Sequence, residues 1–367
     1  MAMLLRSLLP RVGILSPSVS CPRLIRCLSS AAVCPPARAA VYHQHGAPDH
    51  VLQLVEVEGR ELLEGEVCVK MLAAPINPSD INRIEGVYPM RPPLPAVGGT
   101  EGVGVVVSVA PGVSKLKVND WVIPSHPHIG TWRTYIAKEE SAWCLVAKDV
   151  PEKYAATVSV NPCTALRMLQ DIVDLKPGAS VVQNGATSMV GQCVIQLAHL
   201  NDLQTINLIR DRPDLDSVKE RLKALGADYV LTEEELGSLD KKTLAGRAQA
   251  KLGLNCVGGS AATAVMKLLG EGGVMVTYGG MAKKPITLST GPLIFKDLRL
   301  QGFWLGKWKS NHSDEEFSTM VNYLLRLVRD GKLQYAMDEV QFSDFDTALQ
   351  KALGQQGSAL KQVLIFN

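Results

Sequence analysis

The 367-residue sequence predicts an α/β fold in two parts, a doubly wound parallel sheet preceded by a β-rich region. Two patterns carry this prediction. From Ser180 onward, apolar runs of strand length alternate with stretches of helical periodicity, as parallel strands joined by crossover helices require. Before that, residues 40–147 consist mostly of short apolar or alternating runs separated by turn residues. An apolar content of 46% supports two real cores.

The parallel sheet is centred on Ser180–Ala198, SVVQNGATSMVGQCVIQLA. This stretch begins as a buried strand, passes through a turn of small residues and continues with helical periodicity. Such a turn lets backbone N–H groups and the positive end of a helix approach a phosphate, so it predicts a dinucleotide site. The G-x-G-x-x-G pattern is incomplete, because Ala186 and Ser188 replace its first two glycines and only Gly191 remains. An ordinary strand–turn–helix with small packing residues is the alternative.

The next predicted strand, Gln204–Arg210, ends in Arg210-Asp211-Arg212. This strand end falls about 20 residues beyond Gly191, where a site that prefers NAD carries an acidic residue for the ribose 2′-hydroxyl. Two guanidinium groups instead suit a 2′-phosphate, so the sequence predicts NADPH rather than NADH. Alternatively, both arginines lie in water and Asp211 neutralises one of them.

The remaining elements follow from the same patterns. In the parallel sheet we expect strands over Ala227–Leu231, Leu252–Val257, Gly273–Tyr278 and Leu298–Leu305, with helices over Asp214–Leu225 and Ser260–Leu269. In the β-rich region we expect strands over Val51–Val57, Glu66–Ala73, Gly102–Val109 and Asp120–Pro124. At the C-terminus we expect helices over Asp314–Asp330 and Ser343–Leu353 and strands over Leu333–Phe342 and Lys361–Phe366. These last elements are expected to fold back onto the β-rich region.

Residues 1–37 have the composition of a mitochondrial transit peptide. Arg6, Arg11, Arg23 and Arg26 occur there without any Asp or Glu, among many Ser, Ala and Leu. The arginines interrupt the apolar run and leave it too short for a secretory signal or a membrane span. Removing this segment changes the formal net charge from +2 to −2, so no basic field remains to bind nucleic acid.

The eight cysteines predict a reducing compartment. Cys21, Cys27 and Cys34 fall in the N-terminal segment, whereas Cys68, Cys144, Cys163, Cys193 and Cys256 are scattered singly. The sequence contains no C-x-x-C pair, so we expect no structural zinc site.

The stretch from Asn77 to Gly104 is the most distinctive part of the β-rich region, and it reads NPSDINRIEGVYPMRPPLPAVGGTEGVG. Together with the NGATSMVG turn and the RDR strand end, it resembles the medium-chain dehydrogenase/reductase superfamily. Within that superfamily it is similar to the zinc-free, quinone-reductase-like branch, and most of all to the mitochondrial 2-enoyl thioester reductases. The resemblance covers residues 39–367.

The resemblance implies that the protein holds no metal. The Asn-Pro-Ser-Asp run stands where the zinc enzymes of the superfamily carry their first metal-binding cysteine. His126 and His128 have no cysteine or acidic partner at a useful spacing, so we interpret them as loop residues.

The resemblance also implies a Rossmann domain with a GroES-like catalytic domain, and NADPH-dependent reduction of trans-2-enoyl thioesters in mitochondrial fatty acid synthesis. The tyrosine of the family's G-x-Y-P motif is Tyr88 here, which makes Tyr88 the expected proton donor. A phenol suits the chemistry, because it stays protonated at slightly alkaline pH and can still protonate the α-carbon of an enolate. The alternative is that Tyr88 only packs on Pro89.

The family's cofactor contacts map onto positions scattered along the chain. They are Asn161, the turn residues Thr187, Ser188, Met189 and Val190, the strand end Arg210, Asp211 and Arg212, the loop Tyr278, Gly279, Gly280 and Met281, the segment Phe303, Trp304 and Leu305, and Lys361. Alternatively, Phe303 and Trp304 pack in the core or in a dimer interface, and Lys361 is a solvated charge at a strand end. Lys307 and Lys309 near the same segment are candidates for the phosphates of the substrate, or else belong to a solvated basic loop.

The resemblance further implies a domain division and partners. Residues 1–37 form the transit peptide, 38–160 and 306–367 the catalytic domain, and 161–305 the NADPH-binding domain. The expected partners are an enoyl-CoA or enoyl-acyl-carrier-protein substrate and a second copy of the chain, in the mitochondrial matrix, with no nucleic acid. Two other functions stay open at this point, an NADPH:quinone oxidoreductase and a dinucleotide-dependent binding protein without catalysis.

Overall fold

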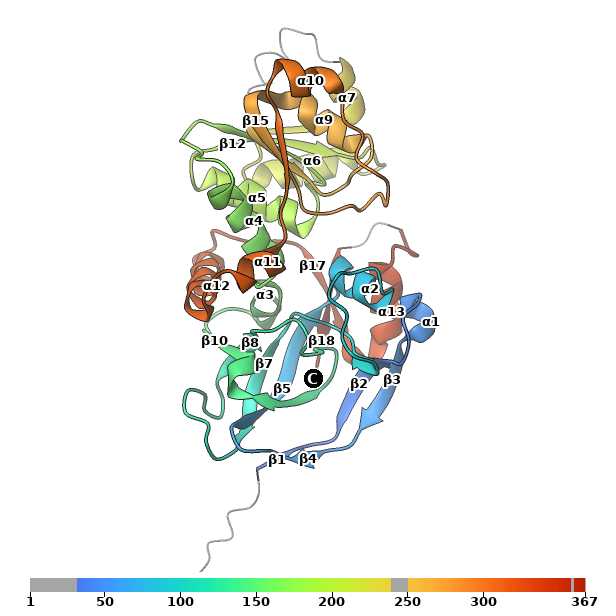
Figure 1. The fold of residues 1–367 in the computed structure, drawn as a ribbon, viewed down its shortest axis with the longest axis vertical. Helices are drawn as coiled ribbons and strands as arrows, with labels where there is room; N and C mark the ends of the chain where they lie inside the picture. The colour runs from blue at the N-terminus through green and yellow to red at the C-terminus, as the bar shows by residue number, and fades with distance from the viewer. Residues whose placement is uncertain (1–31, 239–249, 358–359, 367) are drawn as a thin grey trace, which may run out of the picture. The chain divides into compact units, whose positions relative to one another are not determined.

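The computed structural model describes residues 32–238, 250–357 and 360–366 (Figure 1). The predicted transit peptide therefore lies outside the described residues up to residue 31. Residues 32–37 of the predicted transit peptide are described, and β1 (Val33–Cys34) among them pairs with β4 (Arg60–Glu61). The boundary predicted at residue 37 falls at the first residue of β2 (Ala37–Tyr42), so cleavage there would remove β1.

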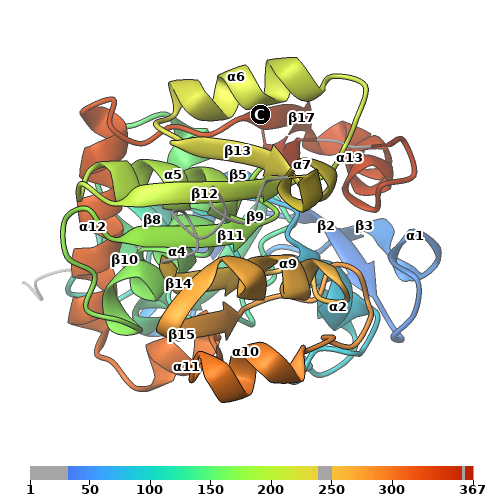
Figure 2. The same cartoon turned by 90° about the horizontal axis from the view of Figure 1, so that it is seen from above.

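The second half of the chain forms a six-stranded sheet in the order β13-β12-β11-β14-β15-β16. Its strands are β11 (Ser180–Asn184), β12 (Gln204–Ile209), β13 (Tyr229–Thr232), β14 (Ala250–Asn255), β15 (Leu269–Thr277) and β16 (Arg299–Gly302). Every neighbouring pair is parallel, which confirms the doubly wound sheet, and Figure 2 shows the first five of these strands in succession. Five consecutive residues of β12 are buried, as a parallel sheet covered on both faces requires.

Helices accompany these strands in the chain, and all of them except α10 bury apolar residues. They are α4 (Asn161–Asp171), α5 (Met189–His199), α6 (Leu215–Ala224), α7 (Glu233–Ser238), α9 (Ala261–Leu268) and α10 (Thr290–Phe295). Helix α5 is the most enclosed, with every residue before His199 buried. This central position explains its nearly continuous apolar sequence.

The β-rich region forms two further sheets. The larger has the order β10-β8-β7-β5-β18-β17, with β9 also paired to β5, and the smaller has the order β3-β2-β6. Their strands are β2 (Ala37–Tyr42), β3 (Gln53–Val57), β5 (Glu66–Pro75), β6 (Ala96–Val97), β7 (Val103–Val109), β8 (Trp121–Pro124), β9 (Tyr135–Glu139), β10 (Trp143–Val146), β17 (Met337–Gln341) and β18 (Lys361–Ile365). The pairing of β18 with β5 confirms that the C-terminal elements return to the β-rich region.

The remaining helices connect these sheets. They are α1 (Pro48–Val51), α2 (Pro78–Ile84), α3 (Glu152–Thr157), α11 (Leu305–Ser310), α12 (Asp314–Arg329), α13 (Phe345–Ala352) and the short 3₁₀ turns η1 (Glu140–Ala142) and η2 (Phe342–Asp344). Helix α12 begins with a capping box between Ser313 and Glu316, and its apolar face joins the core that also contains α4 and α5. None of the helices within the described ranges has the length and apolar character needed to cross a membrane.

Six strands of the β-rich region are absent from the predicted elements, namely the two-residue strands β1, β4 and β6 and the longer β2, β9 and β10. The β2 sequence ARAAVY is rich in Ala and adjoins the predicted presequence, so its composition gives no strand signal. Both β9 and β10 are only four or five residues long, which is too short for alternation to be recognised.

Candidate functional site

The turn after β11 is as tight as the sequence predicts. Gly185 has a positive φ of 64°, and a Cβ there would lie 2.5 Å from the Cys256 sulfur. A Cβ on Gly191 would lie 2.6 Å from the backbone of Ala186. Ser188 caps α5, because its Oγ accepts a hydrogen bond from the Gly191 N–H at 3.1 Å. The first turn of α5 therefore presents free N–H groups beside a small-residue turn, which suits a phosphate.

The four predicted contacts of this turn have different surroundings. Ser188 is exposed and Thr187 is half-buried, whereas Met189 and Val190 are buried in the core. Met189 and Val190 can therefore offer a ligand only their backbone.

Asparagine side chains join the carboxyl ends of neighbouring strands. Asn184, at the end of β11, donates from Nδ2 to Asn255 Oδ1 at the end of β14 at 2.7 Å. Asn255 in turn donates from Nδ2 to Thr277 Oγ1 on β15 at 3.1 Å. These side chains fix the edge of the sheet from which the turn projects. The sequence prediction missed both asparagines, although a buried strand that ends in Asn was the available signal.

The strand end after β12 places Arg210 at the surface and Arg212 in a half-buried position. Arg210 is exposed and makes no ion pair among the described residues, while Arg212 lies 3.8 Å from the Asp214 carboxylate. Asp211 is exposed and its Oδ1 accepts a hydrogen bond from the Arg212 N–H at 2.9 Å. Of the two guanidinium groups, that of Arg210 is therefore the better placed to meet an anion from solvent.

The loop after β15 folds back over β14. The Met281 N–H donates to the Cys256 carbonyl at 3.0 Å, and a Cβ on Gly279 would lie 3.0 Å from that same carbonyl oxygen. Gly280 and the Met281 side chain are exposed, whereas the hydroxyl of Tyr278 is enclosed and burial raises its pKa. Gly279 is therefore needed for close backbone approach, whereas a Cβ on Gly280 would meet nothing within 4 Å.

The segment after β16 divides its three predicted residues between core and surface. Leu305 is buried and Phe303 packs against the same core. Trp304 is 39% exposed, and its indole is directed toward Tyr88 rather than into the core. Its indole Nε1–H donates to the hydroxyl oxygen of Tyr88 at 2.8 Å, and the two rings meet edge to face with centroids 6.1 Å apart.

Tyr88 is held from three directions. Its backbone N–H donates to the Asn82 carbonyl at 3.1 Å, just before the end of α2. The Arg83 guanidinium lies 4.6 Å from the centre of its ring, a cation–π contact. Its oxygen accepts the hydrogen bond from Trp304, and this hydroxyl makes no other hydrogen bond within the described part of the chain. The hydroxyl hydrogen of Tyr88 is therefore available to donate.

A buried network surrounds Asn77, at the start of α2. Glu101 Oε2 accepts from Asn77 Nδ2 at 2.8 Å, and Glu101 Oε1 accepts from the Val160 N–H at 2.8 Å. Asn77 Oδ1 accepts from Lys361 Nζ at 2.9 Å and from Asn161 Nδ2 at 3.1 Å. Two predicted cofactor contacts, Asn161 and Lys361, thus meet at a residue that the sequence prediction did not consider for this role.

Burial perturbs the ionisable groups of this network. It raises the pKa of Glu101 to about 7, against the hydrogen bond from Asn77 and the charge of Lys361. It lowers the pKa of Lys361, although the nearby carboxylates of Glu101 and Asp80 oppose this change. A carboxyl group that titrates near neutrality beside a buried ammonium group is a mark of functional sites.

The side chains near Asn77 do not fit a zinc ion. The Asn77 amide donates to Glu101 and accepts from Lys361 and Asn161, and an amide engaged in this way is a poor ligand for zinc. Within the described ranges, no three His, Cys, Asp or Glu side chains gather where they could hold a metal.

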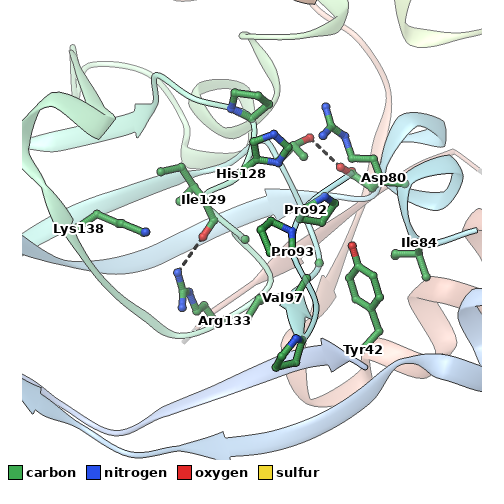
Figure 3. Close-up of a pocket in the computed structure, with 18 of the residues that line it drawn as sticks. Tyr42, Asp80, Ile84, Pro92, Pro93, Val97, His128, Ile129, Arg133 and Lys138 are labelled. Atoms are coloured by element: carbon green, nitrogen blue, oxygen red, sulfur yellow. Dashed lines mark hydrogen bonds between the residues drawn. The ribbon is translucent and has the colours of Figure 1, made fainter. Parts of the chain in front are cut away.

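A cavity of about 440 Å³ lies in the β-rich region, and its lining includes Asp80 and Arg83 (Figure 3). All its lining residues fall between Tyr42 and Lys138, and the exposed His128 is among them. None of the predicted cofactor contacts lines it.

The chain matches two known domain families. Residues 63–152 match the alcohol dehydrogenase GroES-like domain, and residues 190–351 match the family described as zinc-binding dehydrogenase.

Three known proteins are similar over nearly the whole chain. The mitochondrial enoyl-(acyl-carrier-protein) reductase of Arabidopsis thaliana is 59% identical over 90% of this chain and 89% of its own length. The solved 2-enoyl thioester reductase heterodimer Etr1p/Etr2p of Candida tropicalis has a TM-score of 0.83 at 36% identity, covering 90% of this chain and 99% of that one. The solved complex of Etr1p with NADP and crotonyl-CoA has a TM-score of 0.82 at 34% identity with the same coverage. The chain belongs to the mitochondrial enoyl-(acyl-carrier-protein) reductase family of the medium-chain dehydrogenase/reductase superfamily.

Proposed function

We propose that the chain reduces trans-2-enoyl thioesters, of coenzyme A or of acyl carrier protein, with NADPH, as a step of mitochondrial fatty acid synthesis. The observation that carries the proposal is the hydrogen bond from Trp304 to the oxygen of Tyr88. Because the indole uses the tyrosine's acceptor side, the hydroxyl hydrogen is left for transfer to a substrate carbon.

Through its hydrogen bond with Trp304, Tyr88 contacts the same edge of the parallel sheet as the turn after β11. Trp304 follows the carboxyl end of β16, and parallel strands present their carboxyl ends on one side. β16 is separated from β11 by β15 and β14, so three strand spacings, about 14 Å, lie between the two ends. The ion pair between Lys283 and Glu85, at 3.3 Å, also joins the loop after β15 to the end of α2. This arrangement supports one extended site.

The residues of this edge fit NADPH. The N–H groups of α5 behind Ser188 would receive its pyrophosphate, and the exposed Arg210 would pair with its 2′-phosphate. The proposed contacts with NADPH also include the loop Tyr278–Met281, Asn161 and Lys361. When bound, NADPH supplies the hydride that adds to the β-carbon of the thioester.

The chain's own part is to deliver the proton. Hydride addition leaves negative charge shared between the thioester oxygen and the α-carbon, and Tyr88 gives its hydroxyl proton to that carbon. The phenolate that remains is stabilised by the Trp304 N–H and by the Arg83 guanidinium above the ring. The Trp304 N–H and the Arg83 guanidinium are both in place before the reaction, so no reorganisation is needed at that moment.

We further propose the domain division and location that the sequence predicts. The division between residues 161–305 and the ranges that flank them, up to residue 160 and from residue 306, fits the sheets, because β11 to β16 all lie within 161–305. The arginine-rich, acid-free composition of residues 1–31 and the mitochondrial names of the relatives support the mitochondrial matrix.

We also propose a homodimer that pairs through β16. This strand lies at the edge of the sheet and all four of its residues are exposed. Leu300 on β16 is 39% exposed, and Phe295 at the end of α10 is 84% exposed. An unpaired strand edge beside apolar side chains invites a second strand.

The oxidation of NADPH by the full chain, followed at 340 nm, tests the proposed activity. We expect rapid turnover with crotonyl-CoA and NADPH, and slow turnover when NADH replaces NADPH. Turnover of a small quinone without turnover of the thioester would make the chain a quinone reductase. Tight NADPH binding without turnover of either compound would leave a binding protein without catalysis.

A further inference from the structure

Two cysteines that are distant in the sequence touch each other in the β-rich region. Cys34 lies in β1 and Cys68 in β5, and both side chains are buried. The Cys68 thiol donates to the Cys34 sulfur at a sulfur–sulfur distance of 2.9 Å, and both cysteines are free. The mechanism proposed above uses neither of them.

Cations surround this pair. Arg60 and Arg133 lie close enough to act on Cys34, and Arg60 also forms a bidentate ion pair with Glu66 at 2.6 and 2.8 Å. The Arg133 guanidinium donates to the Ile129 carbonyl at 2.8 Å and its Nε is enclosed without a partner among the described residues. Burial lowers the pKa of Arg133 to about 10, so this group still carries its charge at neutral pH.

The cations favour the thiolate of Cys34. The hydrogen bond from Cys68 and, to a smaller degree, the charges of Arg133 and Arg60 lower the pKa of Cys34 against the effect of burial. A low-pKa thiol with a second thiol beside it is typical of cysteines that peroxides oxidise. The four other cysteines within the described residues differ, because burial raises the pKa of each: Cys144, Cys163, Cys193 and Cys256.

Two features would give a small molecule access to the pair, although neither cysteine lines the cavity itself. The cavity of about 440 Å³ is lined by Arg60, Arg133 and Ala137, and Ala137 is the residue opposite Cys68 in the β5–β9 ladder. Figure 3 shows Arg133 and the neighbouring Lys138 on one side of this cavity. In addition, β1 is a two-residue strand whose single strand partner among the described residues is β4. Local opening of so short a strand costs little and would expose Cys34.

We propose that Cys34 and Cys68 form a redox site that hydrogen peroxide converts to an intramolecular disulfide. The Cys34 thiolate attacks one peroxide oxygen, the O–O bond breaks, and the hydroxide that leaves takes up a proton to become water. Cys68 then attacks the sulfur of the Cys34 sulfenic acid, loses its proton, and a second water leaves. Two thiols and one hydrogen peroxide thus give one disulfide and two waters, with the two sulfurs oxidised and the peroxide reduced.

The disulfide would fasten β1 to the central strand of the larger sheet. It would close a loop between positions 34 residues apart and so raise the midpoint temperature of thermal unfolding. The site also requires that the mature protein keep Cys34, which a cleavage after residue 37 would remove.

The test is peroxide treatment of the full chain, followed by tryptic peptide mapping without reduction. We expect a cross-link between the peptides of residues 27–38 and 61–70, formed while Cys144, Cys163, Cys193 and Cys256 are still reduced. Cys27 lies in the first of these peptides, so the variant Cys27→Ser must retain the cross-link, and Cys34→Ser must lose it. Dithiothreitol should remove the cross-link and return the unfolding midpoint to its value before oxidation.

A second variant tests the role of the cations without removing a cysteine. Arg133→Met should slow formation of the cross-link at pH 7 by about three- to tenfold, since loss of one nearby charge raises a thiol pKa by up to about one unit. Arg133→Lys should restore most of the rate. The proposal is wrong if Cys34 and Cys68 are oxidised no faster than Cys144, or if the cross-link forms through Cys27. A mature N-terminus after residue 37 in protein from mitochondria would also overturn it.

Discussion

Replacing Tyr88 by Phe removes one oxygen atom and tests whether the proton comes from this residue. The structural loss is small, because the Trp304 indole is 39% exposed and its N–H can turn to water. One partly exposed hydrogen bond contributes about 0.5–1.5 kcal/mol, so the fold and the ring contact with Arg83 should persist. The loss of a positioned general acid is far larger and lowers kcat by about 10²- to 10⁴-fold.

The assay compares kcat and the Kd for NADPH in the parent chain, in Tyr88→Phe and in Trp304→Phe. In Tyr88→Phe we expect kcat to fall at least 100-fold while the Kd for NADPH changes by less than about threefold. Trp304→Phe is the matched control, since it keeps the proton donor and removes only its hydrogen-bond partner. We expect a loss of about three- to tenfold in kcat there.

The double variant distinguishes a shared role from two separate ones. Because Trp304 acts through the Tyr88 hydroxyl, adding Trp304→Phe to Tyr88→Phe should cost almost nothing further. A Tyr88→Phe variant whose kcat stays within threefold of the parent would refute the assignment and leave Tyr88 as a packing residue.

Three further predictions follow from the other parts of the site. Arg210→Ala should raise the KM for NADPH by about 10- to 100-fold and leave the KM for NADH unchanged, measured by initial rates with each cofactor. The pKa of about 7 for Glu101 lies above that of a carboxyl group in the unfolded chain. The free energy of unfolding should therefore fall by on the order of 3 kcal/mol as the pH rises from about 4.5 to 7. Glu101→Gln should abolish this slope in urea unfolding, and an unchanged slope would contradict the raised pKa. Leu300→Asp should give a monomer in sedimentation velocity, whereas a dimer in this variant would place the interface elsewhere.

The regular elements could be predicted from the sequence because their signals are local. Each predicted strand of the parallel sheet overlaps an observed one, from β11 to β16, since buried strands read as short apolar runs between turn residues. The turn at Gly185 was also recognisable, because small residues mark close backbone approach. The resemblance supplied Tyr88, whose role no local pattern indicates.

Contacts between distant residues could not be predicted in this way. Lys361 and Asn77 are 284 residues apart and meet only because β18 pairs with β5. Cys34 was assigned to the presequence by composition, although β1 brings it to Cys68. The sequence predicts that Lys309 either binds a phosphate of the substrate or lies in a solvated loop. In the structure its ammonium group donates to the Ser125 carbonyl at 2.9 Å and lies 3.6 Å from the centre of the Phe317 ring. Register and burial, rather than composition, decide such contacts.

The most direct measurement is the reduction of crotonyl-CoA by the full chain with NADPH in deuterated water, with the product read by NMR. The account predicts butyryl-CoA that carries one solvent deuterium at the α-carbon and none at the β-carbon, because the proton comes from the exchangeable Tyr88 hydroxyl. Solvent deuterium at the β-carbon, or consumption of NADPH without a saturated thioester, would contradict it.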